Sequence, residues 1–160
     1  MKNLGLILLG ILVITACGTK KKAIENKDTS AAKTEISTME IIKIKATTGQ
    51  FAKSSDPIMA IDTITVVDNT LFVQLRYGGG CEEHTFEAIG SLAIAKSYPP
   101  IRSVQLVHHA NNDRCRAIVQ KTLEIDVKDI AYQQKDGSEI YFTFENYPHR
   151  VYYKYVETAK

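Results

Sequence analysis

Five of the seven cysteine and histidine residues of this chain, the types best suited to metal binding and catalysis, lie in two short stretches. The first stretch reads YGGGCEEHTF over residues 77–86, and the second reads HHANNDRC over residues 108–115. Cysteine can bind a metal, act as a nucleophile or form a disulfide, and histidine can bind a metal or transfer protons. The two stretches therefore hold the candidate functional residues.

Zinc binding is the first chemistry that these stretches suggest. Two thiolates and two imidazoles form a tetrahedral zinc site, and Cys81, His84, His108 or His109, and Cys115 would supply them. The spacing from either histidine of the second stretch to Cys115 matches no common zinc motif. We expect no metal, with His84, His108 and His109 as the alternative ligands. With the cysteines paired, a site of these histidines with Glu82, Glu83 or Asp113 also stays open.

Catalysis has weaker support in the same residues. A thiol beside histidines could act as a nucleophile, but a second cysteine explains the first more simply as a disulfide partner. The glycines at 78–80 lack the Gly-Lys-Ser/Thr sequence of a phosphate-binding loop, so positive φ or close backbone approach explains them better. Glu82 and Glu83 point to opposite sides of an extended chain. We expect no catalytic residue and no cofactor.

The N-terminus has the features of an export signal. Lys2 precedes an apolar run, Leu4–Thr15, of about 12 residues, whereas a membrane-spanning helix needs roughly 20. Ile14–Cys17 (ITAC) resembles the lipobox of bacterial lipoproteins, which implies that Cys17 is acylated with palmitate-like chains and becomes the first residue. Gly18, rather than Asp, favours the outer membrane under the sorting rule of enteric bacteria.

The chain divides into three parts on this interpretation. Residues 1–16 form a lipoprotein signal peptide, and residues 17–38 form a lipidated flexible stalk, because this polar stretch holds too little apolar surface to fold. Residues 39–160 form a β-rich extracytoplasmic domain. We expect a location on the membrane through the lipid, facing the periplasm or the cell surface.

Charge excludes one class of partner. The formal net charge of the chain is +2 and its pI is about 8.4, without the basic stripe that nucleic-acid binding requires. We therefore expect no nucleic acid among the partners.

Cys81 and Cys115 are the two cysteines left once Cys17 is acylated. In an oxidising compartment two cysteines of one domain usually pair. Their separation of 34 residues predicts that a bridge stabilises the domain by up to about 3.8 kcal/mol through loop closure.

Short strands separated by turn signals make up the domain. Apolar and polar residues alternate in segments such as Leu71–Tyr77, and no sustained 3.6-residue period occurs after residue 39. Asp68-Asn69 and Asp136-Gly137 predict hairpin turns, and Tyr147–Arg150 predicts a third. The predicted strands are 39–46, 58–67, 71–77, 85–95, 103–109, 117–127, 130–135, 139–146 and 151–156, the first being either a strand or the end of the stalk.

These strands favour an all-β fold. We expect an antiparallel β-sandwich, with an immunoglobulin-like outline but without the core Trp of that fold, and an open β-barrel is the alternative. Residues 87–96 leave room for a short helix.

The two stretches together resemble a pattern found in small, functionally uncharacterised bacterial lipoproteins. The pattern reads GGC-x-x-H-x-F and then H-x-A-N-x-D-x-C some 25 to 30 residues later. Two positions depart from it, Asn112 where glycine is common and His109 where an acidic residue is common. The resemblance implies a secreted β-rich domain with a Cys81–Cys115 bridge, and it implies no activity. The matching residues are Gly79, Gly80, Cys81, His84, Phe86, His108, Ala110, Asn111, Asp113 and Cys115.

Alternation places His108 on the same face as Val104 and Leu106, toward the core. A buried imidazole needs a hydrogen-bond partner, and Asp113 or a carbonyl of the turn at Asn111 would provide it. We expect His84, His108, Asp113 and Asn111 to organise the loops or to hold a ligand.

The expected function is a non-enzymatic, lipid-anchored envelope protein that binds an unknown protein or ligand. A small hydrolase or a metal-binding protein using His84, His108 and Asp113 is one alternative, and an inhibitor protein is the other.

Overall fold

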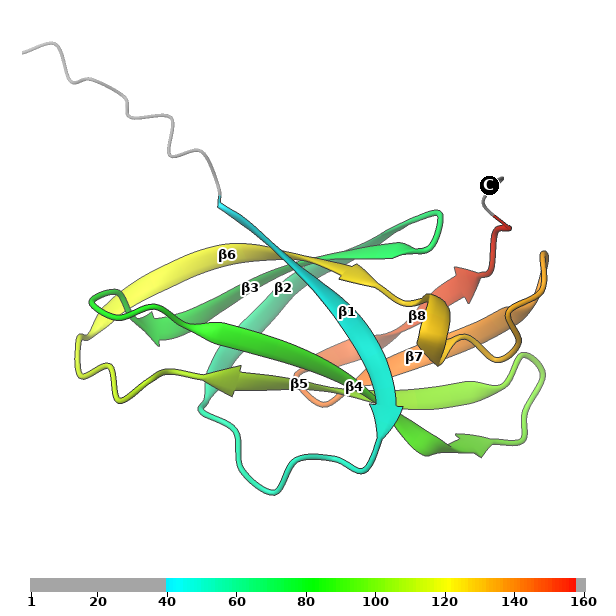
Figure 1. The fold of residues 1–160 in the computed structure, drawn as a ribbon, viewed down its shortest axis with the longest axis horizontal. Coiled ribbons are helices and arrows are strands. Elements are labelled where there is room, and N and C mark those ends of the chain that lie inside the picture. The colour runs from blue at the N-terminus through cyan, green and yellow to red at the C-terminus, as the bar shows by residue number, and fades with distance from the viewer. Residues whose placement is uncertain (1–39, 158–160) are drawn as a thin grey trace, which may run out of the picture. The chain divides into compact units, whose positions relative to one another are not determined.

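The computed structural model describes residues 40–157 (Figure 1). This part of the chain forms eight strands and one short 3₁₀ helix, η1, after the sixth strand. The elements are β1 (Ile41–Gly49), β2 (Ile58–Val67), β3 (Thr70–Gly79), β4 (Thr85–Ala95), β5 (Ile101–His109), β6 (Ala117–Asp126), η1 (Lys128–Ile130), β7 (Glu139–Phe144) and β8 (Tyr147–Lys154).

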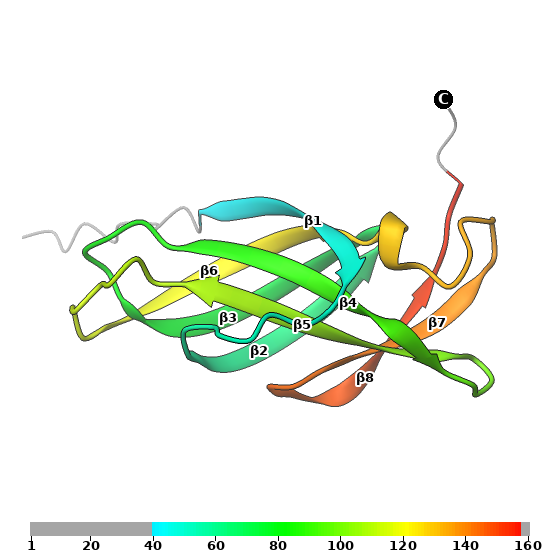
Figure 2. The ribbon, with the colours of Figure 1, turned by 60° about the horizontal axis from the view of Figure 1, so that its bottom comes forward.

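The eight strands form one sheet that is nearly closed into a barrel (Figures 1 and 2). The strand order is β2-β3-β6-β1-β4-β5-β7-β8, and the two end strands, β2 and β8, lie in contact. The predicted all-β class is confirmed. The barrel that we considered as the alternative is the arrangement found, in place of two packed sheets.

The sheet is mixed, which corrects the expectation of an antiparallel one. β1 lies between β6 and β4 and runs parallel to both, and β5 runs parallel to β7. The four other pairings are antiparallel. Alternation within a strand shows which face is buried, but it carries no information on the direction of the neighbouring strand.

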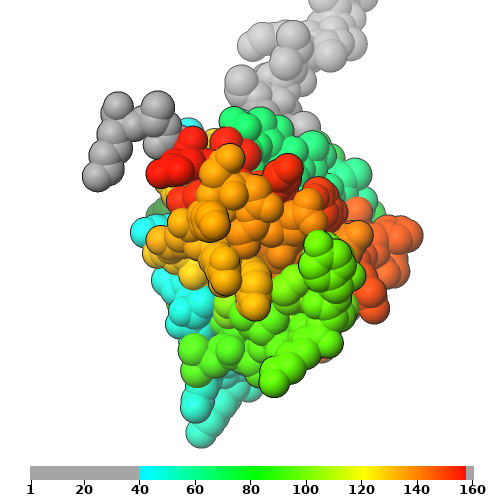
Figure 3. Space-filling model, turned by 90° about the vertical axis from the view of Figure 1, so that its right-hand side faces the viewer, coloured from blue at the N-terminus to red at the C-terminus, as the bar shows by residue number. Residues whose placement is uncertain are grey.

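The predicted strand over residues 130–135 is wrong. Ile130 ends η1 and is fully buried, and the chain then runs as a loop to β7. Asp136-Gly137 makes no hairpin, because the N–H of Gly137 donates to the carbonyl of Tyr155 beyond β8. This loop (orange) lies beside the β4–β5 loop (green) at the end of the molecule shown in Figure 3.

Two further local predictions need correction and one is confirmed. Tyr147–Arg150 begins β8, and the turn before it lies at Glu145-Asn146. Residues 85–95 form β4 throughout, so the short helix is absent from this segment. The β2–β3 hairpin turns at Asp68-Asn69 as expected, with Asp68 at a φ of 49°.

The core fills the inside of the barrel. Leu71, Val73 and Leu75 of β3 are fully buried, as their alternation predicted, and they face inward with the apolar residues of the other strands. At one end this core continues into Tyr77, Phe86 and His108. No helix within residues 40–157 is long and apolar enough to cross a membrane.

Candidate functional site

A disulfide joins the two stretches that hold the candidate residues. Cys81 follows β3, Cys115 precedes β6, and these strands pair up to Gly79 and Ala117. The Cα atoms of the two cysteines lie 5.9 Å apart. The bridge therefore closes one end of the β3–β6 pair, and the predicted pairing is confirmed.

Asp113 is the centre of the loops around the disulfide. Its Oδ2 atom accepts hydrogen bonds from the backbone N–H groups of Gly80, Cys81 and Glu82 at 2.8, 2.8 and 3.0 Å. Its Oδ1 atom accepts the N–H of Cys115 at 2.8 Å. The N–H groups of Cys115, Cys81 and Glu82, followed by the ring of His84, hold the pKa of this carboxyl well below its usual range. Asp113 is therefore an ionised clamp on both halves of the disulfide loop.

Glycine is required where the chain passes over this carboxylate. Gly79 and Gly80 have φ values of 148° and 113°, in a region that side chains rarely allow. A Cβ atom on Gly79 would lie 2.6 Å from Cε1 and Nε2 of His84 and 2.9 Å from Oδ2 of Asp113. The glycine run thus serves positive φ and close approach, as expected from the sequence.

His84 and His108 complete the site as a buried pair. Nδ1 of His84 lies 2.7 Å from Nε2 of His108, and Nε2 of His84 lies 3.1 Å from Oδ2 of Asp113. On the far side, Nδ1 of His108 lies 3.3 Å from the carbonyl oxygen of Pro57. The side chains of His84 and Asp113 are only 2% and 0% exposed. A continuous polar chain thus runs through the barrel end, away from solvent.

Two aromatic rings enclose the histidine pair. Tyr77 stacks on His84 with ring centroids 4.6 Å apart, and Phe86 stacks on His108 at 4.8 Å and an interplanar angle of 8°. Phe86 and His108 are also register partners of β4 and β5. Burial lowers the pKa of His108, and a positive charge on His84 would lower it further.

Asn111 shapes the loop that presents Asp113. Asn111 and Asn112 both adopt the left-handed conformation, with φ values of 51° and 60°. The side-chain amide of Asn111 donates to the carbonyl of Glu83, which ties this loop to the first stretch. Asparagine tolerates this conformation better than most residues, so Asn112 replaces the glycine of the pattern without difficulty.

The remaining candidates lie outside the buried site. His109 faces the other side of the sheet, where it pairs with Glu87 at 3.1 Å, so the three histidines do not converge. Glu82 and Glu83 are exposed. Within residues 40–157, Cys81, Asp113 and Cys115 are the one group whose positions suit a metal, but both sulfurs are bound to each other in the disulfide.

The segment between β1 and β2 also belongs to the site, which was not expected from the sequence. The N–H of His108 donates to Oγ of Ser55 at 2.9 Å, and the N–H of Asp56 donates to the carbonyl of His108 at 2.8 Å. Asp56 also accepts the N–H of Ala110 through its side chain. The sequence around these residues, Ser-Ser-Asp-Pro, signals a loop, but nothing in it points to a histidine about 50 positions later.

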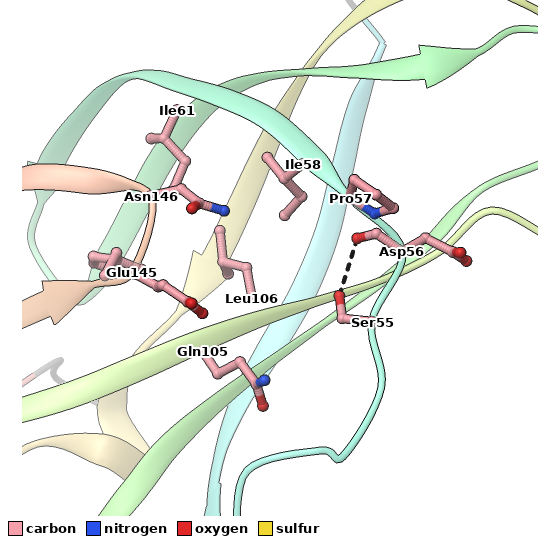
Figure 4. A pocket seen from close by; sticks show the side chains of 10 residues that line it. Ser55, Asp56, Pro57, Ile58, Ile61, Gln105, Leu106, Glu145 and Asn146 are labelled. Carbon is pink, nitrogen blue, oxygen red and sulfur yellow. Dashed lines mark hydrogen bonds between the residues drawn. The ribbon is translucent and has the colours of Figure 1, made fainter.

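A cavity of about 300 Å³ lies next to the site without reaching it. Figure 4 shows residues 55–58 on one side, Glu145 and Asn146 opposite, and Gln105 and Leu106 between them. None of His84, His108 and Asp113 lines this cavity. The histidine pair is thus not part of the lining of this cavity.

Comparison with known proteins identifies the fold and no family. No family model and no curated protein sequence matches the chain. A NigD-like immunity protein from Bacteroides caccae has a similar structure, with a TM-score of 0.53 and 16% identity over 70% of this chain and 59% of that one. A protein of unknown function from Bacteroides vulgatus gives a TM-score of 0.47 and 13% identity, over 74% of this chain and 57% of that one. The chain thus spans less than two thirds of the length of either protein.

Proposed function

We propose that this protein is a non-enzymatic binding module, held by a lipid on Cys17 to a bacterial membrane and facing the periplasm or the cell surface. The burial of His84, His108 and Asp113 is the observation that supports a non-enzymatic function most strongly. These are the residues that we considered for catalysis, and they contact one another and do not line the cavity beside Pro57.

The geometry argues against acid–base catalysis at this site. A general base must come within hydrogen-bond reach of the proton that it removes. Each carboxylate oxygen of Asp113 already accepts at least one backbone N–H, and both ring nitrogens of His84 already face protein atoms. A substrate would have to displace these contacts before it could reach the histidines or the carboxylate.

The location rests on two independent features. The N-terminal sequence through Cys17 is typical of bacterial lipoproteins, although residues 1–39 lie outside the described part of the structure. The disulfide between Cys81 and Cys115 is typical of proteins that fold in an oxidising compartment. A lipid-anchored domain of the periplasm or the cell surface accounts for both, with the outer membrane preferred because of Gly18.

Mass spectrometry of the mature N-terminus tests the anchor. We expect a chain that begins at an acylated Cys17 and sediments with the membrane fraction. Cys17→Ser should prevent acylation, so that the domain is released or the precursor accumulates. An unmodified N-terminus downstream of residue 17 in the wild-type protein would contradict the proposal.

An inhibitor of the immunity type is the second candidate function. It is favoured by the similarity in fold to the NigD-like immunity protein, and a disulfide-linked β-domain that presents loops could block another protein. In this role, a strain that lacks the protein should be outcompeted when it is grown in contact with its parent and should grow equally well alone. If the strain without the protein survives equally well in both cultures, the immunity-type function is rejected and the binding function proposed above is kept.

A further inference from the structure

The protons of the buried histidine pair can be counted from its outer contacts. Nε2 of His84 faces Oδ2 of Asp113, which accepts four backbone N–H groups through its two oxygens, and those of Cys115, Cys81 and Glu82 hold the pKa of the carboxyl low, so that it is ionised. A carboxylate only accepts hydrogen bonds. Nε2 of His84 must therefore carry a proton.

The other end of the pair has the same requirement. Nδ1 of His108 faces the carbonyl oxygen of Pro57, which also only accepts hydrogen bonds. Nδ1 of His108 must therefore carry a proton as well. Two neutral imidazoles hold one N–H each, so these two protons account for a fully neutral pair.

The inner contact then needs a third proton. Nδ1 of His84 and Nε2 of His108 lie 2.7 Å apart, and in a neutral pair each would direct a lone pair at the other. We propose that His84 and His108 hold a third proton between these two nitrogens, so that the folded domain carries one buried positive charge paired with Asp113. The short distance suits a charge-assisted hydrogen bond.

The surroundings favour this positive charge. The face of Tyr77 packs on His84 and that of Phe86 on His108, and aromatic faces attract cations. Burial, followed by the effect of His84, lowers the pKa of His108, which places the charge on the ring next to Asp113.

Few other ionisable groups face the pair. Asp113 comes from the loop before β6, the phenol of Tyr77 from β3, and Asp56 from the loop before β2, where it acts on His108. From β4 the pair meets Phe86, which is uncharged. Burial raises the pKa of Tyr77, so this phenol is neutral at physiological pH. Among residues 40–157, these carboxylates are the charges that face the pair, and both favour the third proton.

This arrangement acts as a proton-dependent latch between β5 and the disulfide loops. Removing the third proton sets two lone pairs against each other and opens the contact. Above the ordinary histidine pKa of about 6.5, the folded pair holds more protons than the unfolded chain, so stability falls as pH rises. Below pH 6.5, the two histidines of the unfolded chain hold four ring protons, whereas the folded pair keeps three because burial lowers the pKa of His108. Stability therefore falls as pH decreases. The contribution of the pair is therefore greatest near pH 6.5.

Nitrogen-15 NMR of the histidine-labelled domain at pH 7 tests the count directly. We expect three protonated ring nitrogens in the pair, both of His84 and Nδ1 of His108. Two protonated nitrogens in the wild-type protein would overturn the proposal. His109→Gln, which removes the exposed neighbour, should leave the three signals in place and assists their assignment.

Asp113→Asn tests the source of the charge. Without the carboxylate, the variant should hold two protons on the pair at pH 7, and a third proton that persists would contradict the role of Asp113. If this variant does not fold, urea unfolding between pH 5 and 9 decides, with the wild type compared with the double variant His84→Gln, His108→Gln, which has no histidine left in the pair. The wild-type midpoint should be highest near pH 6.5 relative to that of the variant, and a constant difference would overturn the latch.

Discussion

Asp113 illustrates how one side chain determines a local structure. Its two oxygens accept the N–H groups of both disulfide cysteines, and one of them also contacts His84. The carboxylate thus links the covalent bridge to the buried histidines. Its neighbours in the sequence, Asn111 and Asn112, contribute the left-handed turn that aims it.

Replacing Gly79 tests how tightly this site is packed. Gly79→Ala should destabilise the domain by more than about 1 kcal/mol, because its φ is positive and its new Cβ would lie 2.6 Å from the ring of His84. Gly78→Ala is the matched control, since a Cβ there meets no atom within 4 Å. Urea unfolding of both variants provides the comparison. Equal urea midpoints for Gly79→Ala and Gly78→Ala would show that the site can accommodate a Cβ atom at residue 79.

At the scale of elements, the disulfide holds together the ends of two neighbouring strands. β3 and β6 pair over their whole length, and the bridge lies just beyond Gly79 and Ala117. The loops that it closes are those that carry His84 and Asp113. The bridge therefore supports the site as well as the sheet.

Reduction should weaken the domain measurably. We expect no free thiol in denaturant before reduction, and a loss of at most about 3.8 kcal/mol in the free energy of unfolding after it, from the 34-residue loop. The double variant Cys81→Ser, Cys115→Ser should match the reduced protein. Thiol titration and thermal melting measure these effects. Two reactive thiols in protein isolated from the periplasm would reject the bridge.

Strand positions were largely predictable from the sequence, because alternation is local. Leu71, Val73 and Leu75 mark the inner face of β3, and Asp68-Asn69 marks its turn. The structure of the segment that begins at residue 130 was not predictable, because its apolar residues resemble those of a strand. Ile130 is instead buried in the core from the end of a 3₁₀ helix. Local patterns report burial, and they cannot distinguish the element that provides it.

Contacts between distant segments were the least accessible from sequence. β1 pairs in parallel with β4 and β6, which are distant from it in the sequence. Ser55 and Pro57 contact His108, which is also distant in the sequence. Local patterns cannot predict either arrangement. The candidate residues His84, His108, Asp113 and Asn111 could be singled out because their types and the cysteines beside them are unusual, and the structure brings them to one end of the barrel. Their partners Tyr77 and Phe86 look like ordinary core residues.

At the scale of the whole molecule, the barrel places its polar cluster inside and its cavity elsewhere. The cavity beside Pro57 and Leu106 does not include the histidines, and the polar contacts of the cluster are to other parts of the barrel end. The central claim is that the cluster is structural.

Thermal melting of the wild type, His84→Ala and His108→Ala, each with and without zinc, copper or nickel, tests this claim most directly. Each substitution leaves a buried partner unpaired, so we expect a loss of about 1–3 kcal/mol and a lower Tm. His109→Ala, at an exposed position, should change the Tm little. None of the metals should raise the wild-type Tm. A His84→Ala variant with an unchanged Tm, which loses a metal-induced rise seen in the wild type, would contradict the account.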